Sequence, residues 1–267
     1  MTEAKAVTQR RVAVVTGAVQ GLGLGTAIAL AGAGFDVALV DLHEANEQTQ
    51  QACDQVSRLG AQARYYQLDI ADLSRHESVL KLIARDFGRI DTLVNNAGIA
   101  ARPLTDILEL SVEAFDHSVD INLRGTFFLT QAFANLAIAQ KWATPENYVS
   151  VIIVSSIAAE MVNTDRAQYC VTKAALSMTT KLFAQRLASE HIYVHEIRPG
   201  FMQTAMTASA GNTIVDDWIN DGRVPIARWG QAEDIGKSIA TLASGAMPYT
   251  TGQAFWIAGG LNLPPAP

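Results

Sequence analysis

Short apolar segments rich in β-branched residues alternate with longer helix-forming segments along almost the whole 267-residue chain. The apolar segments are typical of buried strands, and strands separated by helices run parallel in a sheet covered on both faces. Because crossovers between parallel strands are right-handed, the pattern predicts an α/β fold of the doubly wound Rossmann type with a seven-stranded parallel sheet. The predicted strands are residues 11–15, 35–40, 64–68, 90–94, 148–154, 192–197 and 253–257, and the predicted helices are residues 21–33, 44–59, 73–87, 111–139, 167–189 and 233–243.

The composition predicts one globular domain over residues 1–267, because no repeat or linker divides the chain and 49% of it is hydrophobic. With 20 basic and 26 acidic residues the net charge is −6, which argues against nucleic acid as a main partner. The uncharged segment of residues 21–35 is too short and glycine-rich to span a membrane, so we expect no membrane association and a cytoplasmic location. Two cysteines, and histidines without a metal-ligand spacing, favour neither a disulfide framework nor a metal site.

A glycine-rich turn follows the first predicted strand and opens the first predicted helix. It reads Thr-Gly-Ala-Val-Gln-Gly-Leu-Gly over residues 16–23. Glycines let the backbone approach a phosphate closely, and the N-terminus of the next helix attracts that anion with its N–H groups and dipole. The turn therefore predicts a phosphate cradle, and the alternative is a tight turn that binds nothing. The candidate contacts are Gly17, Gln20, Gly21, Leu22 and Gly23.

Asp41 lies at the end of the second predicted strand, where a carboxylate can accept hydrogen bonds from the ribose hydroxyls of a dinucleotide. It would also repel a 2′-phosphate, and neither Arg nor Lys stands at residues 19, 20, 42 or 43 to neutralise one. The sequence therefore favours NAD over NADP, although Asp41 could simply cap the following helix. Residues at neighbouring strand ends should line the same edge of the sheet. These candidates are Leu42, Asp69, Ile70, Asn96, Ala97 and Gly98.

Tyr169 and Lys173 stand four residues apart on one predicted helix, and Ser156 ends the strand before it. A phenol with a pKa of roughly 10 is a poor base at neutral pH, and a neighbouring ammonium would lower that value. The set therefore indicates proton transfer to or from a hydroxyl group by Tyr169, with Ser156 bonded to the same oxygen. The alternative is a packed tyrosine and a solvated lysine.

These motifs together resemble the short-chain dehydrogenase/reductase family over nearly the whole chain. The matching pieces are the turn at residues 16–23, Asn-Asn-Ala-Gly at residues 95–98, Ile-Asn at residues 121–122, Ser156, the Tyr-x-x-x-Lys motif and Pro199-Gly200. A departure is Ala258, where many relatives have Asp before the final Gly-Gly pair.

The resemblance implies several roles. Ser156 would stabilise the substrate oxygen, Tyr169 would act as acid/base, Lys173 would bind the ribose and tune the tyrosine, and Asn122 would support a water relay to that lysine. The segment after Pro199 and Gly200 would hold the nicotinamide through Met202 and Thr204, with Thr204 against the carboxamide. The resemblance also implies a homotetramer.

The resulting hypothesis is an NAD(H)-dependent oxidoreductase that interconverts a secondary alcohol and a ketone. The substrate would be a sugar, a polyol or another hydroxy compound, chosen by a mobile lid at residues 204–229. The first alternative is a 3-oxoacyl-(acyl-carrier-protein) reductase, a class that usually prefers NADPH. An alternative of another class is a non-catalytic dinucleotide sensor on the same fold.

Overall fold

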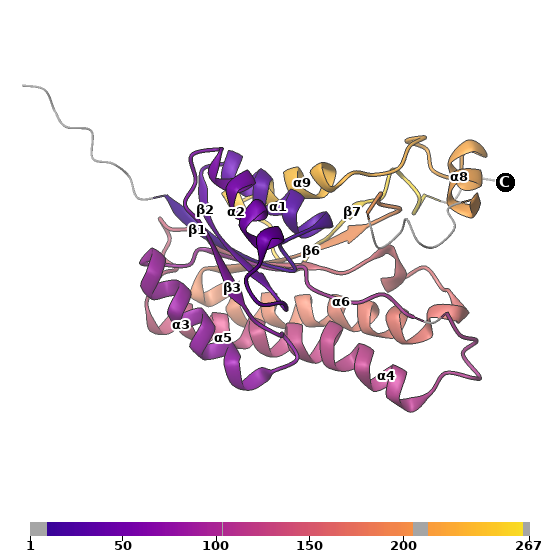
Figure 1. The fold of residues 1–267 in the computed structure, drawn as a ribbon, viewed down its shortest axis with the longest axis horizontal. Coiled ribbons are helices and arrows are strands. Elements are labelled where there is room, and N and C mark those ends of the chain that lie inside the picture. The colour runs from indigo at the N-terminus through magenta and orange to yellow at the C-terminus, as the bar shows by residue number, and fades with distance from the viewer. Residues whose placement is uncertain (1–9, 103, 205–212, 264–267) are drawn as a thin grey trace, which may run out of the picture.

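The computed structural model describes residues 10–102, 104–204 and 213–263, and contains a seven-stranded parallel sheet (Figure 1). The strand order is β3-β2-β1-β4-β5-β6-β7, so the doubly wound Rossmann-type fold is confirmed. The predicted strands agree with the observed ones to within one or two residues. The strands are β1 (Arg11–Thr16), β2 (Phe35–Asp41), β3 (Ala63–Gln67), β4 (Thr92–Asn95), β5 (Val149–Val154), β6 (Ile192–Pro199) and β7 (Ala254–Ile257).

Helices cover both faces of the sheet, which is why the central strands are apolar along their length. In Figure 1, α1, α2 and α9 lie on one face, and α3, α5 and α6 lie on the other. The helices are α1 (Gly21–Gly32), α2 (Glu47–Ser57), α3 (His76–Phe87), α4 (Val112–Ser118), α5 (Thr126–Ala139), α6 (Ala167–Leu187), α8 (Thr213–Asn220) and α9 (Ala232–Ser244).

Strand β1 shows how the sheet separates two hydrophobic cores. Alternate side chains of a strand point to opposite faces. Val12 and Val14 accordingly join the core beneath α3, α5 and α6, while Ala13 and Val15 join the core beneath α1, α2 and α9. All four side chains are almost completely buried, because helices cover both faces of β1, which pairs with β2 on one side and β4 on the other.

The predicted helix over residues 111–139 is continuous but not α-helical throughout. A π-helical segment, Val119–Gly125, separates α4 from α5. Inside this segment the side chain of Asn122 bonds both backbone groups of Ile99, and a Cβ at Gly125 would lie 2.5 Å from the carbonyl oxygen of Ile70. These tertiary contacts favour the wider turn, and helical periodicity in the sequence does not report them.

Two other predicted segments differ in detail. The helix predicted over residues 44–59 begins later, because Asn46 caps it with a capping box that includes Thr49. The predicted lid at residues 204–229 contains the expected short helix, α8, while residues 205–212 of it lie outside the described residues. The lid's movement stays a prediction.

The order in which strands are added to the sheet reverses between β1 and β4. From β1 the chain builds outward to β2 and β3, and from β4 it builds the other way to β7. Ligands of such sheets bind at this switch point, beyond the carboxyl ends of the strands. The fold therefore indicates where a functional site should be sought.

We predict a pH-dependent loss of stability from His195 of β6, whose side chain is fully buried against the hydroxyl of Tyr148 at 3.0 Å. Burial lowers its pKa from 6.5 to about 4. Between those values the unfolded chain binds a proton that the folded chain does not, so stability falls as the pH drops from about 6.5 to about 4. The loss should reach about 3 kcal/mol.

Urea unfolding at several pH values checks this. His195→Gln should flatten the dependence of the unfolding free energy on pH, whatever it does to stability at pH 7. His117→Gln, on the exposed face of α4, is the matched control and should retain the wild-type slope. Equal slopes for wild type and His195→Gln would contradict the assignment.

Candidate active site

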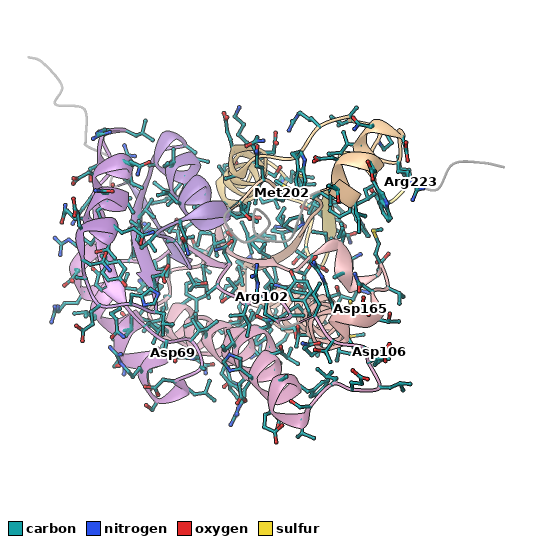
Figure 2. The ribbon with its side chains drawn as sticks, turned by 45° about the vertical axis from the view of Figure 1, so that its right-hand side comes forward. Asp69, Arg102, Asp106, Asp165, Met202 and Arg223 are labelled. Carbon is teal, nitrogen blue, oxygen red and sulfur yellow. The ribbon has the colours of Figure 1, made fainter. Side chains whose placement is uncertain are left out.

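A cleft of about 380 Å³ opens at the switch point, beyond the carboxyl ends of the central strands. Its walls come from distant parts of the chain: Figure 2 labels Asp69, which follows β3, and Met202, which follows β6. Every residue proposed from the sequence as a dinucleotide contact lines this one cleft. These residues are Gly17, Gln20, Gly21, Leu22, Gly23, Asp41, Leu42, Asp69, Ile70, Asn96, Ala97, Gly98, Tyr169, Lys173, Pro199, Gly200, Met202 and Thr204.

The glycine-rich turn between β1 and α1 has a backbone that only glycine adopts readily. Gly17 and Gly21 have φ values of 64° and 54°, and a Cβ built at Gly23 would lie 1.9 Å from the carbonyl oxygen of Gly17. The first turn of α1 thus meets the cleft with its N–H groups and no intervening side chain at these positions. This geometry suits the pyrophosphate of a dinucleotide.

Hydrogen bonds fix the turn to the end of β4. The hydroxyl of Thr16 accepts hydrogen bonds from the backbone N–H groups of Asn96 and Ala97, both at 3.0 Å. The Asn96 amide donates in return to the carbonyl oxygens of Thr16 and Gly17, at 2.9 and 3.2 Å. The two sides of the switch point are therefore held together before any ligand binds.

Asp41 ends β2 at the rim of the cleft. Its carboxylate accepts hydrogen bonds from the backbone N–H groups of Leu42 at 2.8 Å and Val19 at 3.3 Å. Both donors stabilise a charged carboxylate here. Among the described residues that line the cleft, Lys173 is the one Lys or Arg, and it belongs to the far wall. A 2′-phosphate at this rim would meet a negative charge with no neighbouring cation in the described lining.

Three further lining residues of the cleft form what we call the Ser–Tyr–Lys cluster: Ser156, Tyr169 and Lys173. Tyr169 and Lys173 lie one turn apart on α6, with the Lys173 Nζ 5.5 Å from the centre of the tyrosine ring. Ser156 is the second residue after the end of β5, and a hydrogen bond from its side chain lowers the pKa of the Tyr169 phenol. The cluster can therefore present two hydroxyl groups to a single substrate oxygen.

Burial dominates the electrostatics of the cluster. It raises the pKa of Tyr169, against the lowering effect of the Ser156 hydrogen bond. It also lowers the pKa of Lys173 to about 8, against the raising effect of the Glu196 carboxylate. The pKa of Tyr169 is therefore raised and not lowered as the sequence predicts, because desolvation of the phenolate outweighs the lowering effects of the Ser156 hydrogen bond and the Arg166 charge.

Lys173 is held in place by the end of β5. Its Nζ donates a 3.0 Å hydrogen bond to the carbonyl oxygen of Val154, two residues before Ser156. The lysine side chain is almost fully buried, so it is a fixed part of the wall rather than a solvated surface residue.

Asn122 is the one proposed site residue outside the cleft lining. It is buried behind the wall, where it bonds the backbone of Ile99 at 2.8 and 3.0 Å and the hydroxyl of Thr172 at 3.4 Å. It therefore fastens the segment after β4 to α6, next to Lys173. Its part in a water relay stays a prediction.

Several residues line the cleft beside the predicted ones without having been predicted as contacts. They are Thr16, Val40, His43, Leu68, Ile99, Ile121, Val154 and Ser155. Most of them are immediate sequence neighbours of a predicted contact at the end of a strand. The pattern of polar residues at strand ends therefore identified the correct segments but not every residue in them.

Within the described ranges, no three His, Cys, Asp or Glu side chains gather where they could hold a metal ion. None of the helices in those ranges is both long and apolar enough to cross a lipid bilayer.

Comparison with known proteins agrees with this geometry. A family model described as enoyl-(acyl carrier protein) reductase matches residues 17–262. A 3-oxoacyl-(acyl-carrier-protein) reductase from Synechocystis is 34% identical over 254 residues, 95% of this chain and 97% of the relative.

Solved structures show the same likeness. A 3-oxoacyl-(acyl-carrier-protein) reductase from Brucella melitensis in complex with NAD is 39% identical, with a TM-score of 0.91 over 97% of this chain and 99% of that one. A structure from Agrobacterium tumefaciens with bound NADP, assigned as a 2-deoxy-D-gluconate 3-dehydrogenase, is 30% identical with a TM-score of 0.84, covering 96% and 98% of the two chains.

The fold and the cleft define a nicotinamide-dinucleotide oxidoreductase. The chain belongs to the short-chain dehydrogenase/reductase family and acts on CH–OH groups. The expected family is therefore confirmed, and the non-catalytic sensor loses its support.

We predict that Gly23→Ala weakens NADH binding at least tenfold. The added methyl would collide with the Gly17 carbonyl and push the turn out of its phosphate-binding shape. Fluorescence titration with NADH measures the change. The matched control is Gly32→Ala on the same helix, where a Cβ meets open space and an Ala favours the helix by up to about 1 kcal/mol. Wild-type affinity in Gly23→Ala would refute the cradle.

Proposed function

We propose that the enzyme interconverts a 3-hydroxyacyl and a 3-oxoacyl group carried as a thioester, with NAD(H) as the coenzyme. The observation that supports the reaction is the Ser–Tyr–Lys cluster in the lining of the same cleft as the glycine-rich cradle. The named relatives from Synechocystis and Brucella support the thioester substrate. They favour this alternative over the sugar or polyol substrate that the sequence argument preferred.

The chain's own groups supply the proton chemistry. In ketone reduction, Tyr169 gives its phenolic proton to the carbonyl oxygen, while Ser156 hydrogen-bonds the same oxygen and stabilises its developing charge. In alcohol oxidation the phenolate takes the hydroxyl proton. The nicotinamide, when bound, donates or accepts the hydride and, in its oxidised form, adds a positive charge beside the phenol.

Lys173 contributes through charge and position. Its amine lies one turn from the phenol, 5.5 Å from the ring centre, and its proposed role is to favour the phenolate during turnover, which burial in the chain alone disfavours. It is also the lysine expected to bind the ribose. The proposed role of the residues at 200–204 is to hold the nicotinamide from the opposite wall.

Asp41 supports NAD as the preferred coenzyme. The carboxylate is fixed by two backbone N–H groups at the rim and can accept hydrogen bonds from the adenosine ribose. The Brucella relative was solved with NAD, although the Agrobacterium relative holds NADP.

A sugar or hydroxy-acid substrate is the second candidate. Its support is the Agrobacterium relative's assignment to a deoxygluconate. We also propose a homotetramer in the cytoplasm, as the family resemblance implies. Exposed apolar side chains on α6, among them Met178 and Leu182, are consistent with a subunit contact.

A substrate panel tests the proposed reaction. NADH oxidation should be fastest with acetoacetyl-coenzyme A, a 3-oxoacyl thioester, and much slower with keto sugars, while NAD reduction should be slow with xylitol and gluconate. Tyr169→Phe should bind NADH normally and lose at least about 10²-fold in kcat, since it cannot transfer the proton. Faster turnover of a sugar or polyol would refute the thioester substrate in favour of the sugar or hydroxy-acid substrate. Full activity of Tyr169→Phe would refute the tyrosine's role.

We further predict that Asp41→Ala lowers the preference for NADH over NADPH by at least tenfold. The substitution removes both the ribose acceptor and the charge that repels a 2′-phosphate. The ratio of kcat/KM for the two coenzymes is the measurement. Asp54→Ala, an exposed position on α2 away from the cleft, should leave that ratio unchanged. A wild-type preference for NADPH would contradict the prediction outright.

A further inference from the structure

Strand β6 buries a carboxylate that the proposed chemistry has not used. Glu196 is 1% exposed, and its Oε1 accepts hydrogen bonds from the hydroxyls of Ser155 at 2.5 Å and Ser177 at 2.8 Å. The same oxygen pairs with the Arg198 guanidinium at 2.7 Å. A buried charge is costly unless it is paired and hydrogen-bonded, and Glu196 has both.

The partners of Glu196 belong to the segments that carry the Ser–Tyr–Lys cluster. Ser155 stands between Val154, whose carbonyl oxygen anchors Lys173, and Ser156 itself. Ser177 lies one helical turn after Lys173 on α6. One carboxylate therefore joins the end of β5 to the helix that bears Tyr169 and Lys173.

Arg198 completes the network on the same face of β6. Its Nη2 donates to the Ser177 hydroxyl at 2.9 Å, its Nη1 pairs with Glu160, and its guanidinium lies 5.0 Å from the centre of the Trp256 ring. Glu160 is 60% exposed, so solvent screens its charge. Glu196 is thus the buried negative charge paired with Arg198, and its charge also acts to raise the pKa of Lys173.

The other groups near Lys173 do not replace this charge. The titratable and charged residues nearest to it in the chain elements packed around it include Tyr169 and Cys170 on α6, Glu196 and Arg198 on β6, Glu160, the exposed Asp165 and Arg166 between β5 and α6, and the exposed Asp120–Arg124 pair of the π-helical segment. The same elements also carry Lys181 and Arg186, two or more turns further along α6, and Tyr193 and His195 on β6. Burial lowers the pKa of Lys173, and the Glu196 charge is the opposing influence.

We propose that Glu196 is a positioning residue of the active site, which keeps Lys173 charged and holds the Ser156 end of β5 against α6. The inference rests on the proposed roles of Tyr169 and Lys173. A purely structural reading is a buried ion pair that only stabilises the fold. The Arg89–Asp91 pair is such a case, because it lies at the start of β4, at the opposite end of the strands from the cleft.

The test compares Glu196→Gln with Asp91→Asn, since each replaces a buried carboxylate with an amide of the same size. We expect the alkaline limb of the kcat–pH profile for acetoacetyl-coenzyme A reduction to move down by about one pH unit in Glu196→Gln. At pH 8 this amounts to an about fivefold loss of kcat beyond any uniform loss. Asp91→Asn should lower the melting temperature without moving the limb.

Arg198→Gln should move the limb the opposite way, because it removes the cation that neutralises Glu196. It also carries the test if Glu196→Gln does not fold. Glu196→Asp, which keeps the charge, should keep the limb near its wild-type position. An unmoved limb in a folded Glu196→Gln or Arg198→Gln variant, with only a lower melting temperature, would overturn the proposal.

A second readout needs no substrate. NADH affinity should fall more steeply between pH 6 and pH 8 in Glu196→Gln than in the wild type, because Lys173 loses its proton earlier. Wild type that binds NADH but turns over no compound of the panel would refute the proposed reaction. The affinity comparison would still decide the role of Glu196, so the two failures are distinguishable.

Discussion

All seven strands run in the same direction, and this constraint determines where the chemistry of the chain gathers. Each strand ends at the same edge of the sheet, so the glycine-rich turn, Asp41 and Ser156 meet there although they are far apart in sequence. The reversal of strand order between β1 and β4 opens the cleft at that edge. Helices on both faces then exclude water from the walls, which makes every charge in them expensive.

The free-energy cost of burying a charge explains the arrangement around Lys173. The ammonium group is useful to the phenol of Tyr169 only while it is charged, and burial works against the charge. The structure offsets burial with the Val154 carbonyl oxygen and the Glu196 carboxylate rather than with solvent. The proton chemistry of the site thus depends on strands β5 and β6 as much as on the helix that carries the reacting groups.

Local patterns were enough to predict the fold and most of the cleft. Continuous apolar runs identify parallel strands, and residues such as Asp41 and Asn96 stand out because they interrupt those runs at the ends. Tertiary contacts were not readable in this way: the π-helical segment depends on Asn122 meeting Ile99, which is 23 residues away. Glu196 and Arg198 stand two residues apart, which places them on one face of the strand. Their burial could not be predicted, because a period of two does not distinguish a buried pair from a solvent-facing one.

The reciprocal hydrogen bonds between Thr16 and Asn96 have a mechanical consequence. They tie the phosphate-facing turn to the strand end beside the reacting groups, so neither can shift without the other. Coenzyme and substrate therefore bind to a turn and a strand end whose relative position is already fixed. Adaptation to substrates of different length must therefore come from other residues around the cleft. Substitutions there can change substrate selectivity without changing the geometry of hydride transfer.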